Sequence, residues 1–130
     1  MNHQIAHISL LVKDYNEAIN YYTNKLNFIV IEDVALSETK RWVRIKPQGD
    51  SNFALLLAKA DGEKQMASIG NQTGGRVFLF LTTDNFYRDY PKMKANGIQF
   101  KEEPREEVYG TVAVFSDIYG NLWDFIEPKP

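Results

Sequence analysis

Apolar and polar residues follow one another in blocks that predict strands separated by helices. Residues 5–12 are rich in leucine and β-branched side chains and predict a first strand. Asp14 follows at the position of a helix N-cap, with Glu17 three residues later, which is the spacing of a capping box. Asn27 is typical of a left-handed residue that ends a helix. The apolar positions between them recur at helical spacing and predict a stripe that packs on a sheet: Ala18, Ile19, Tyr22 and Leu26.

Three further strands are predicted in the first half of the chain. One begins at residues 28–31, directly after the helix. Residues 41–46 alternate between apolar and basic side chains, and residues 53–58 form an apolar run. Proline, glycine and aspartate at residues 47–50 predict a turn between these two strands.

The same pattern returns with a period of 70 residues. An apolar run predicts a strand over residues 77–82, and Asp84 then begins a helix that extends over about 84–96 with Gly97 as its C-cap. Pro91 falls inside this helix, where it must open a fresh helical segment or kink the helix, because it lacks a main-chain donor. Three strands are predicted to follow: 98–101, 110–116 and 121–127.

The repeat predicts an α+β fold with two similar modules in a single domain over residues 1–130. The first module covers about 1–65 and the second about 76–130. A polar, glycine-rich segment lies within the predicted linker, about 66–75. Residues 101–107 carry charges of both signs and predict a solvated loop.

Composition narrows the classes of function. The chain has 130 residues, of which 44% are hydrophobic and 25% charged, as in an ordinary globular domain. Its 15 basic and 17 acidic residues give a net charge of −2, which argues against nucleic-acid binding. The absence of cysteine excludes disulfides, cysteine-ligated metals and a cysteine nucleophile. The sequence shows no signal-peptide pattern and no apolar run long enough for a membrane span, so we expect a soluble cytoplasmic protein.

Three segments resemble motifs of one superfamily. Residues 6–14 read AHISLLVKD, residues 18–28 read AINYYTNKLNF, and residues 116–125 read SDIYGNLWDF. Together they resemble the first strand, the first helix and the closing turn and strand of the vicinal oxygen chelate superfamily. That superfamily contains glyoxalase I, extradiol dioxygenases, and the fosfomycin and bleomycin resistance proteins. The resemblance spans nearly the whole chain, and its last segment is the most specific.

The resemblance implies two βαβββ modules that form cup-shaped half-barrels with their helices outside, a small-molecule ligand and a homodimer. It also implies four ligand positions for a divalent metal, on the first and last strand of each module. These positions fall on His7, on Val77 (counted back seven residues from Asp84, as His7 is from Asp14), on the strand at 53–58 and on Asp124. Valine and the apolar strand offer no ligand, so His7 and Asp124 form an incomplete metal set.

Firm binding of a divalent metal is therefore disfavoured, because such ions are usually held by three or more protein ligands. The sequence does not identify a cofactor, and it leaves open whether the protein is an enzyme. One hypothesis is a glyoxalase-like or bleomycin-resistance-like protein that binds a small aromatic or anionic molecule in the cup. The alternative is a metal-dependent lyase, isomerase or dioxygenase that uses His7 and Asp124 as a reduced metal set. A third hypothesis is that the cup is only structural and binds no ligand.

Each candidate residue has a functional and a structural interpretation. His7 could bind a substrate oxygen or act as a general base, or it could be a neutral histidine hydrogen-bonded within the barrel. Asp124 lies on an apolar strand face, where its carboxylate needs compensation by His7, an arginine, a metal or a ligand. Both are also the candidate catalytic residues.

Four further residues are candidates for substrate binding. Trp42 and Arg44 share one strand face and could form an aromatic platform beside an anion-binding guanidinium, or a solvated edge. Tyr109 could close over a ligand, and Gln72 in the linker could offer a polar contact. The aromatic side chains of Trp123 and Phe125 are predicted to be core.

Overall fold

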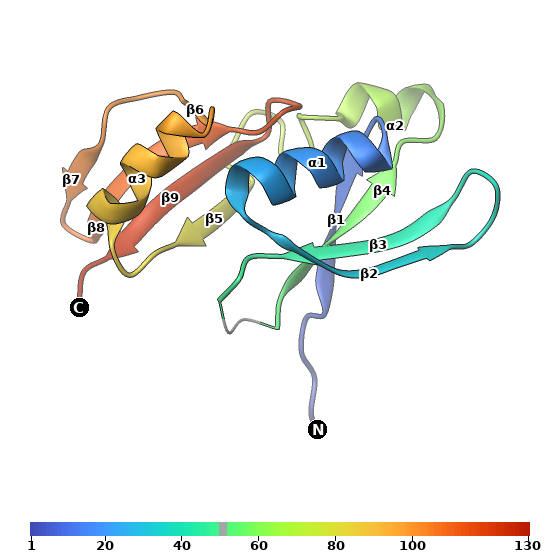
Figure 1. The fold of residues 1–130 in the computed structure, drawn as a ribbon, viewed down its shortest axis with the longest axis horizontal. Coiled ribbons are helices and arrows are strands. Elements are labelled where there is room, and N and C mark those ends of the chain that lie inside the picture. The colour runs from blue at the N-terminus through green and yellow to red at the C-terminus, as the bar shows by residue number, and fades with distance from the viewer. Residues whose placement is uncertain (50–51) are drawn as a thin grey trace. The chain divides into compact units, whose positions relative to one another are not determined.

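The computed structural model describes residues 1–49 and 52–130. The chain divides into two units, residues 1–69 and 70–130, each with its own sheet (Figure 1). Over the described residues the structure contains sheets of four and five strands and three helices, so the predicted α+β class is confirmed. The predicted turn at 47–50 includes Asp50, which lies outside the described residues.

The first unit is a mixed sheet with a helix on one face. Its elements are β1 (His7–Val12), α1 (Tyr15–Leu26), β2 (Ile29–Ala35), β3 (Arg41–Lys46), β4 (Ala54–Lys59) and α2 (Gly62–Ser68). The strand order is β1-β4-β3-β2. The first and last strands pair in parallel, and the other neighbours are antiparallel. β2 is therefore an edge strand, joined to β3 by a hairpin (Figure 1).

The predicted caps and apolar stripe explain why α1 forms where it does. The Asp14 side chain accepts a hydrogen bond of 2.8 Å from the main-chain N–H of Glu17, and Asn27 has a left-handed φ of 58°. Both caps are confirmed. The stripe buries Ala18 and Tyr22 completely. The sheet residues buried with them are Leu10, Val12, Val43, Ile45, Leu55 and Leu57.

The second unit repeats the arrangement with a shorter helix. Its elements are β5 (Leu79–Thr82), α3 (Phe86–Ala95), β6 (Gln99–Phe100), β7 (Arg105–Glu107), β8 (Gly110–Ser116) and β9 (Leu122–Pro128). The strand order is β5-β9-β8-β6, and β7 also pairs with β8. Again the first strand of the unit pairs in parallel with the last, here β5 with β9.

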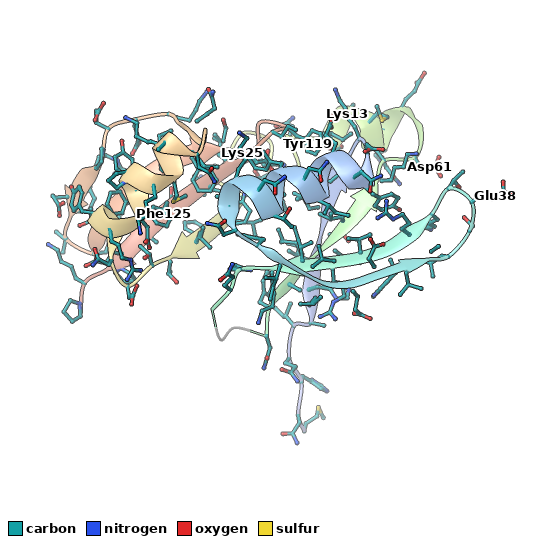
Figure 2. All side chains as sticks on the ribbon, in the orientation of Figure 1. Lys13, Lys25, Glu38, Asp61, Tyr119 and Phe125 are labelled. Carbon is teal, nitrogen blue, oxygen red and sulfur yellow. The ribbon has the colours of Figure 1, made fainter. Side chains whose placement is uncertain are left out.

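Aromatic residues form the core of the second unit. Phe125, labelled in Figure 2, lies on β9. Its ring contacts that of Phe86 on α3, with centroids 5.3 Å apart. The rings of Trp123 and Phe115 stack with centroids 5.7 Å apart. Trp123 and Phe125 are each 3% exposed, so their predicted core role is confirmed. Pro91 lies inside α3, and Gly97 follows the helix with a φ of 96°.

Some elements differ from those predicted. α2 forms at the end of the first unit, where the sequence pattern predicted the end of a module and the start of a linker. β7 pairs with β8 inside the segment 101–107, which was predicted as a solvated loop. Within the part of the chain that the structure describes, none of the helices is long and apolar enough to cross a membrane.

The closing turn between β8 and β9 is built around a buried carboxylate. Asp117 Oδ1 accepts main-chain hydrogen bonds of 2.9 Å from Tyr119 and from Asn121, and Oδ2 accepts one of 2.9 Å from Asn121 Nδ2. Asp117 is 6% exposed and Asn121 2%. Gly120 has a φ of 92°, which side chains other than glycine rarely adopt. The segment SDIYGN, which resembles the closing turn of the superfamily, thus contains the aspartate, glycine and asparagine on which this turn depends.

Candidate functional site

The face of the first sheet that points away from the buried core carries half of the candidate residues. Because neighbouring Cα partners in a sheet point their side chains to the same side, the register defines this face. Ser9 and Leu56 are partners on β1 and β4, Leu56 and Arg44 on β4 and β3, and Arg44 and Glu32 on β3 and β2. This row crosses all four strands, and His7 and Trp42 lie two residues from it on β1 and β3.

His7 and Trp42, two of the predicted site residues, are in contact. Their ring centroids lie 5.4 Å apart with an interplanar angle of 80°, an edge-to-face arrangement. His7 Nδ1 is buried and has no hydrogen-bond partner among the described residues. A buried polar atom is costly to leave unpaired, so a ligand or water that hydrogen-bonds this nitrogen would be stabilising.

Glu32 holds the neighbouring pair of predicted residues in place. Its Oε1 accepts a hydrogen bond of 2.5 Å from Arg44 Nη1 and a longer one of 3.4 Å from Trp42 Nε1. These bonds, chiefly that from Arg44, lower the pKa of Glu32 below its ordinary value. Arg44 Nε is buried and has no partner among the residues that the structure describes. We expect Glu32 to set the orientation of both side chains.

A cavity of about 680 Å³ lies within the first unit. Trp42 and Leu56 belong to its wall and connect it to the face just described. The hairpin between β2 and β3 and the start of α2 also contribute; Glu38 and Asp61 mark these two places in Figure 2. Further residues of the wall are Leu36, Lys40, Lys59 and Gln65.

The cations on the cavity wall differ in their freedom to bind a ligand. Arg41 is fixed by two hydrogen bonds to Asp33, of 2.7 and 3.1 Å, and by one of 2.9 Å to Asn16. In contrast, Lys40 and Lys59 have no ion pair within residues 1–49 and 52–130. Two uncompensated ammonium groups therefore flank an apolar and aromatic wall.

Asp124 lies on β9 in the second unit. Phe80 on β5 and Val114 on β8 are its Cα partners, so the carboxylate has apolar neighbours on both sides. Burial raises the pKa of Asp124 above its ordinary value, and the positive charge of Arg105 partly offsets that effect. Among the described residues, Asp124 accepts no hydrogen bond and forms no ion pair. Within the described residues of its unit, the only compensation for this carboxylate is therefore the more distant charge of Arg105.

The remaining candidates also lie in the second unit. Tyr109 is 54% exposed, and its side chain is hydrogen-bonded to Arg105. Gln72 lies in the turn segment before β5 and is half-buried. That Tyr109 closes over a ligand and that Gln72 contacts one stay predictions. The structure thus brings His7, Trp42 and Arg44 together, whereas Asp124, Tyr109 and Gln72 belong to the other unit.

The structure corrects the comparison between the two modules by one residue. Asn85, not Asp84, caps α3: its side chain accepts a hydrogen bond of 3.1 Å from the main-chain N–H of Arg88. Counting back seven residues from Asn85 places Phe78, rather than Val77, at the position of His7. Phe78 donates its main-chain N–H to Leu122 on β9 at 2.8 Å, which agrees with this alignment.

The same alignment tests the metal site that the family resemblance implies. The counterpart of Ser9 is Phe80, so the partner of Ser9, Leu56, corresponds to the partner of Phe80, Asp124. Phenylalanine and leucine thus stand at two of the four positions, and neither side chain can bind a metal. The described residues also contain no group of three or more histidine, aspartate or glutamate side chains that could hold a metal ion. The side chains present therefore do not fit the divalent metal that the family resemblance implies.

Comparison with known proteins agrees with the fold. A protein of Shewanella frigidimarina (strain NCIMB 400) is 55% identical over 128 residues, covering 98% of this chain and 95% of its own length. The crystal structure of UcmS2 matches with a TM-score of 0.85 and 27% identity, covering 98% of this chain and 99% of its own. TnmS3, an antibiotic binding protein from Streptomyces sp. CB03234, matches with a TM-score of 0.79 and 23% identity, covering 98% of both chains.

A family model provides the assignment. The model of the Glyoxalase/Bleomycin resistance protein/Dioxygenase superfamily matches residues 4–125, nearly the whole chain. The match includes all of β1 with His7 and the first part of β9 with Asp124. The chain therefore belongs to the Glyoxalase/Bleomycin resistance protein/Dioxygenase superfamily.

Proposed function

We propose that the protein binds a small molecule that carries both an aromatic ring and an anionic group, without a metal. The observation that carries this proposal is the cavity of about 680 Å³, whose wall includes Trp42, apolar side chains and the two lysines Lys40 and Lys59. This volume is within the range of about 300–1,000 Å³ that small-molecule sites occupy. The ligand would place its ring against Trp42, Leu36 and Leu56.

Charge supports an anionic group on the ligand. Besides the fixed Arg41, the wall contains Lys40, Lys59 and one carboxylate, that of Asp61. The excess of positive charge attracts an anion to a partly desolvated surface, where its interactions are stronger than in bulk water. Arg44 Nε and His7 Nδ1, both buried and without partners among the described residues, could bind further oxygens of a ligand that reaches the neighbouring sheet face.

The family contains both enzymes and binding proteins, and two observations favour binding. TnmS3, which shares the fold, is an antibiotic binding protein. The metal-dependent alternative lacks donors, because Phe78 and Leu56 occupy two of its four ligand positions. The alternative is a lyase, isomerase or dioxygenase that uses His7 and Asp124 as a reduced metal set. The following experiment distinguishes it from metal-free binding.

We expect 1-naphthoate, an aromatic carboxylate, to bind and Trp42→Ala to raise its Kd about tenfold, because stacking against an indole is worth on the order of 1 kcal/mol or more. Lys40→Gln combined with Lys59→Gln should weaken binding and reduce its salt dependence. Isothermal titration calorimetry in a chelator-containing buffer measures both effects.

Matched variants in the second unit serve as controls for this titration. Tyr87→Ala removes an aromatic ring that is 58% exposed, and Lys101→Gln removes an exposed cation. Both should leave the Kd unchanged. Equal affinity of the wild type and Trp42→Ala for 1-naphthoate would contradict the proposed site. Binding that appears only in a second titration, with a divalent metal in place of the chelator, would instead support the enzyme alternative.

We also propose that two copies of the chain assemble as a homodimer. All seven residues of β2 are exposed, and Ile29, Val30, Ile31 and Val34 are between 37% and 51% exposed. An apolar edge strand is a surface that proteins usually cover, since it otherwise promotes association.

Light scattering during gel filtration should give twice the mass of one chain for the wild type. Ile31→Lys should lower the measured mass to that of one chain, because a lysine in an apolar interface must be desolvated. Ile118→Lys is the matched control, since Ile118 is an isoleucine of similar exposure, 44%, outside β2. A wild type that runs as a single chain at 100 μM would exclude the dimer.

A further inference from the structure

We propose that the sheet of the second unit carries a site for an organic ammonium group, formed by Asp124 and the exposed ring of Phe80. The site lies on β9 and β5 and uses none of the residues of the cavity in the first unit. It therefore goes beyond the proposed binding of an aromatic anion.

The first argument is the uncompensated charge of Asp124. This side chain is half-buried between Phe80 and Val114 and accepts no hydrogen bond from any described residue. A carboxylate that loses part of its hydration and receives no partner costs free energy, so such groups are rarely left alone in folded proteins. A cation from outside the unit would remove this cost.

The second argument is that the nearest arginine is already engaged. Arg105 binds Glu102 at 2.6 Å and Glu107 at 2.7 Å, and it also bonds the Tyr109 side chain. The local charge is thus one guanidinium against three carboxylates, those of Asp124, Glu102 and Glu107. This surplus of negative charge repels anions, and it attracts a cationic ligand.

The third argument is the aromatic ring beside the carboxylate. Phe80 is 65% exposed, although it is a large apolar residue on a strand, and the register places its side chain on the same face as Asp124. A phenyl face attracts ammonium groups. Alkyl-substituted ammonium ions are more weakly hydrated than simple ammonium, so they lose their water more readily on contact with the ring. One carboxylate beside one ring suits such an ion better than a divalent metal, which requires several oxygen or nitrogen ligands.

Choline and its uncharged isostere 3,3-dimethyl-1-butanol test the proposal at constant pH and ionic strength. In an NMR titration of the full chain, choline should shift resonances of β5 and β9, and the isostere should not. Asp124→Asn should weaken choline binding at least tenfold, and Phe80→Leu should weaken it several-fold. Asp84→Asn is the matched control, because it removes a carboxylate that is 85% exposed in the same unit.

Thermal unfolding separates a binding role of Asp124 from a structural one. Asp124 is half-buried between apolar partners and accepts no hydrogen bond from a described residue, so Asp124→Asn, which removes its charge, should be at least as stable as the wild type at pH 7. Loss of choline binding with an unchanged or higher Tm supports the site. Equal binding of choline and its isostere, unchanged choline affinity of Asp124→Asn, or no choline shift at 10 mM would each overturn it.

Discussion

Replacement of Asp117 by alanine is expected to lower the free energy of unfolding by about 3 kcal/mol, since it leaves buried donors unsatisfied. The carboxylate accepts hydrogen bonds from the main chain of Tyr119 and from both the main chain and the side chain of Asn121. Asn121 is only 2% exposed, so water does not readily replace the lost acceptor. Urea denaturation followed by circular dichroism measures the change.

Two variants show whether the effect comes from those bonds. Asp117→Asn keeps one acceptor oxygen and should recover part of the loss. Asp84→Ala removes an exposed carboxylate that forms a surface ion pair with Arg88, which is worth at most about 0.5 kcal/mol. If Asp117→Ala is no more destabilising than Asp84→Ala, the turn is not held by its buried carboxylate.

Gly70→Ala is expected to be comparably destabilising, by about 3 kcal/mol, because an added Cβ meets a rigid neighbour. The Cβ would lie 1.9 Å from the main-chain oxygen of Tyr119 and 2.9 Å from its carbonyl carbon. Gly70 also has a φ of 74°, which disfavours alanine by about 1 kcal/mol on its own. The start of the second unit would have to move away from the closing turn.

Gly74→Ala separates the two contributions. Gly74 has a similar φ of 66°, yet nothing lies within 4 Å of an added Cβ there. It should therefore cost only the conformational strain, about 1 kcal/mol. Equal melting temperatures of the two variants would show that close approach to Tyr119 contributes nothing.

The elements with a local chemical signal could be predicted from the sequence. The Asp14 cap, the left-handed Asn27 and the apolar stripe of α1 each depend on residues within one or two helical turns. The buried aromatic residues of β9 follow from strand alternation. These features need no knowledge of which strands are neighbours.

Elements whose stability comes from distant contacts were missed or shifted. Asp84 and Asn85 are both good capping residues, and in the structure Asn85 caps α3 while its main-chain N–H donates to Thr83 Oγ1 at 3.1 Å. β7 consists of Arg105–Glu107, which have the charges of a solvated loop, and it forms because β8 supplies hydrogen-bond partners. α2 buries none of its residues, so it leaves no apolar stripe in the sequence.

The candidate site shows the same division. Trp42 and Arg44 could be assigned to one face from their alternation, but the role of Glu32 could not be predicted. A register shift between Val30 and Glu32 decides which β2 residue pairs with Arg44, and register depends on the assembled sheet. The cavity likewise combines a hairpin with the start of α2, and these segments are more than twenty residues apart in the chain.

The parallel pairing of the first and last strand in each unit has a consequence for synthesis on the ribosome. His7 pairs with Ala54, and Leu79 pairs with Trp123, so each sheet is closed by the segment of its unit that is translated late. β1 therefore leaves the exit tunnel with its partner strand still untranslated. Because such distant pairings are slow to form and expose strand edges meanwhile, the nascent first half should depend on chaperones until β4 has emerged.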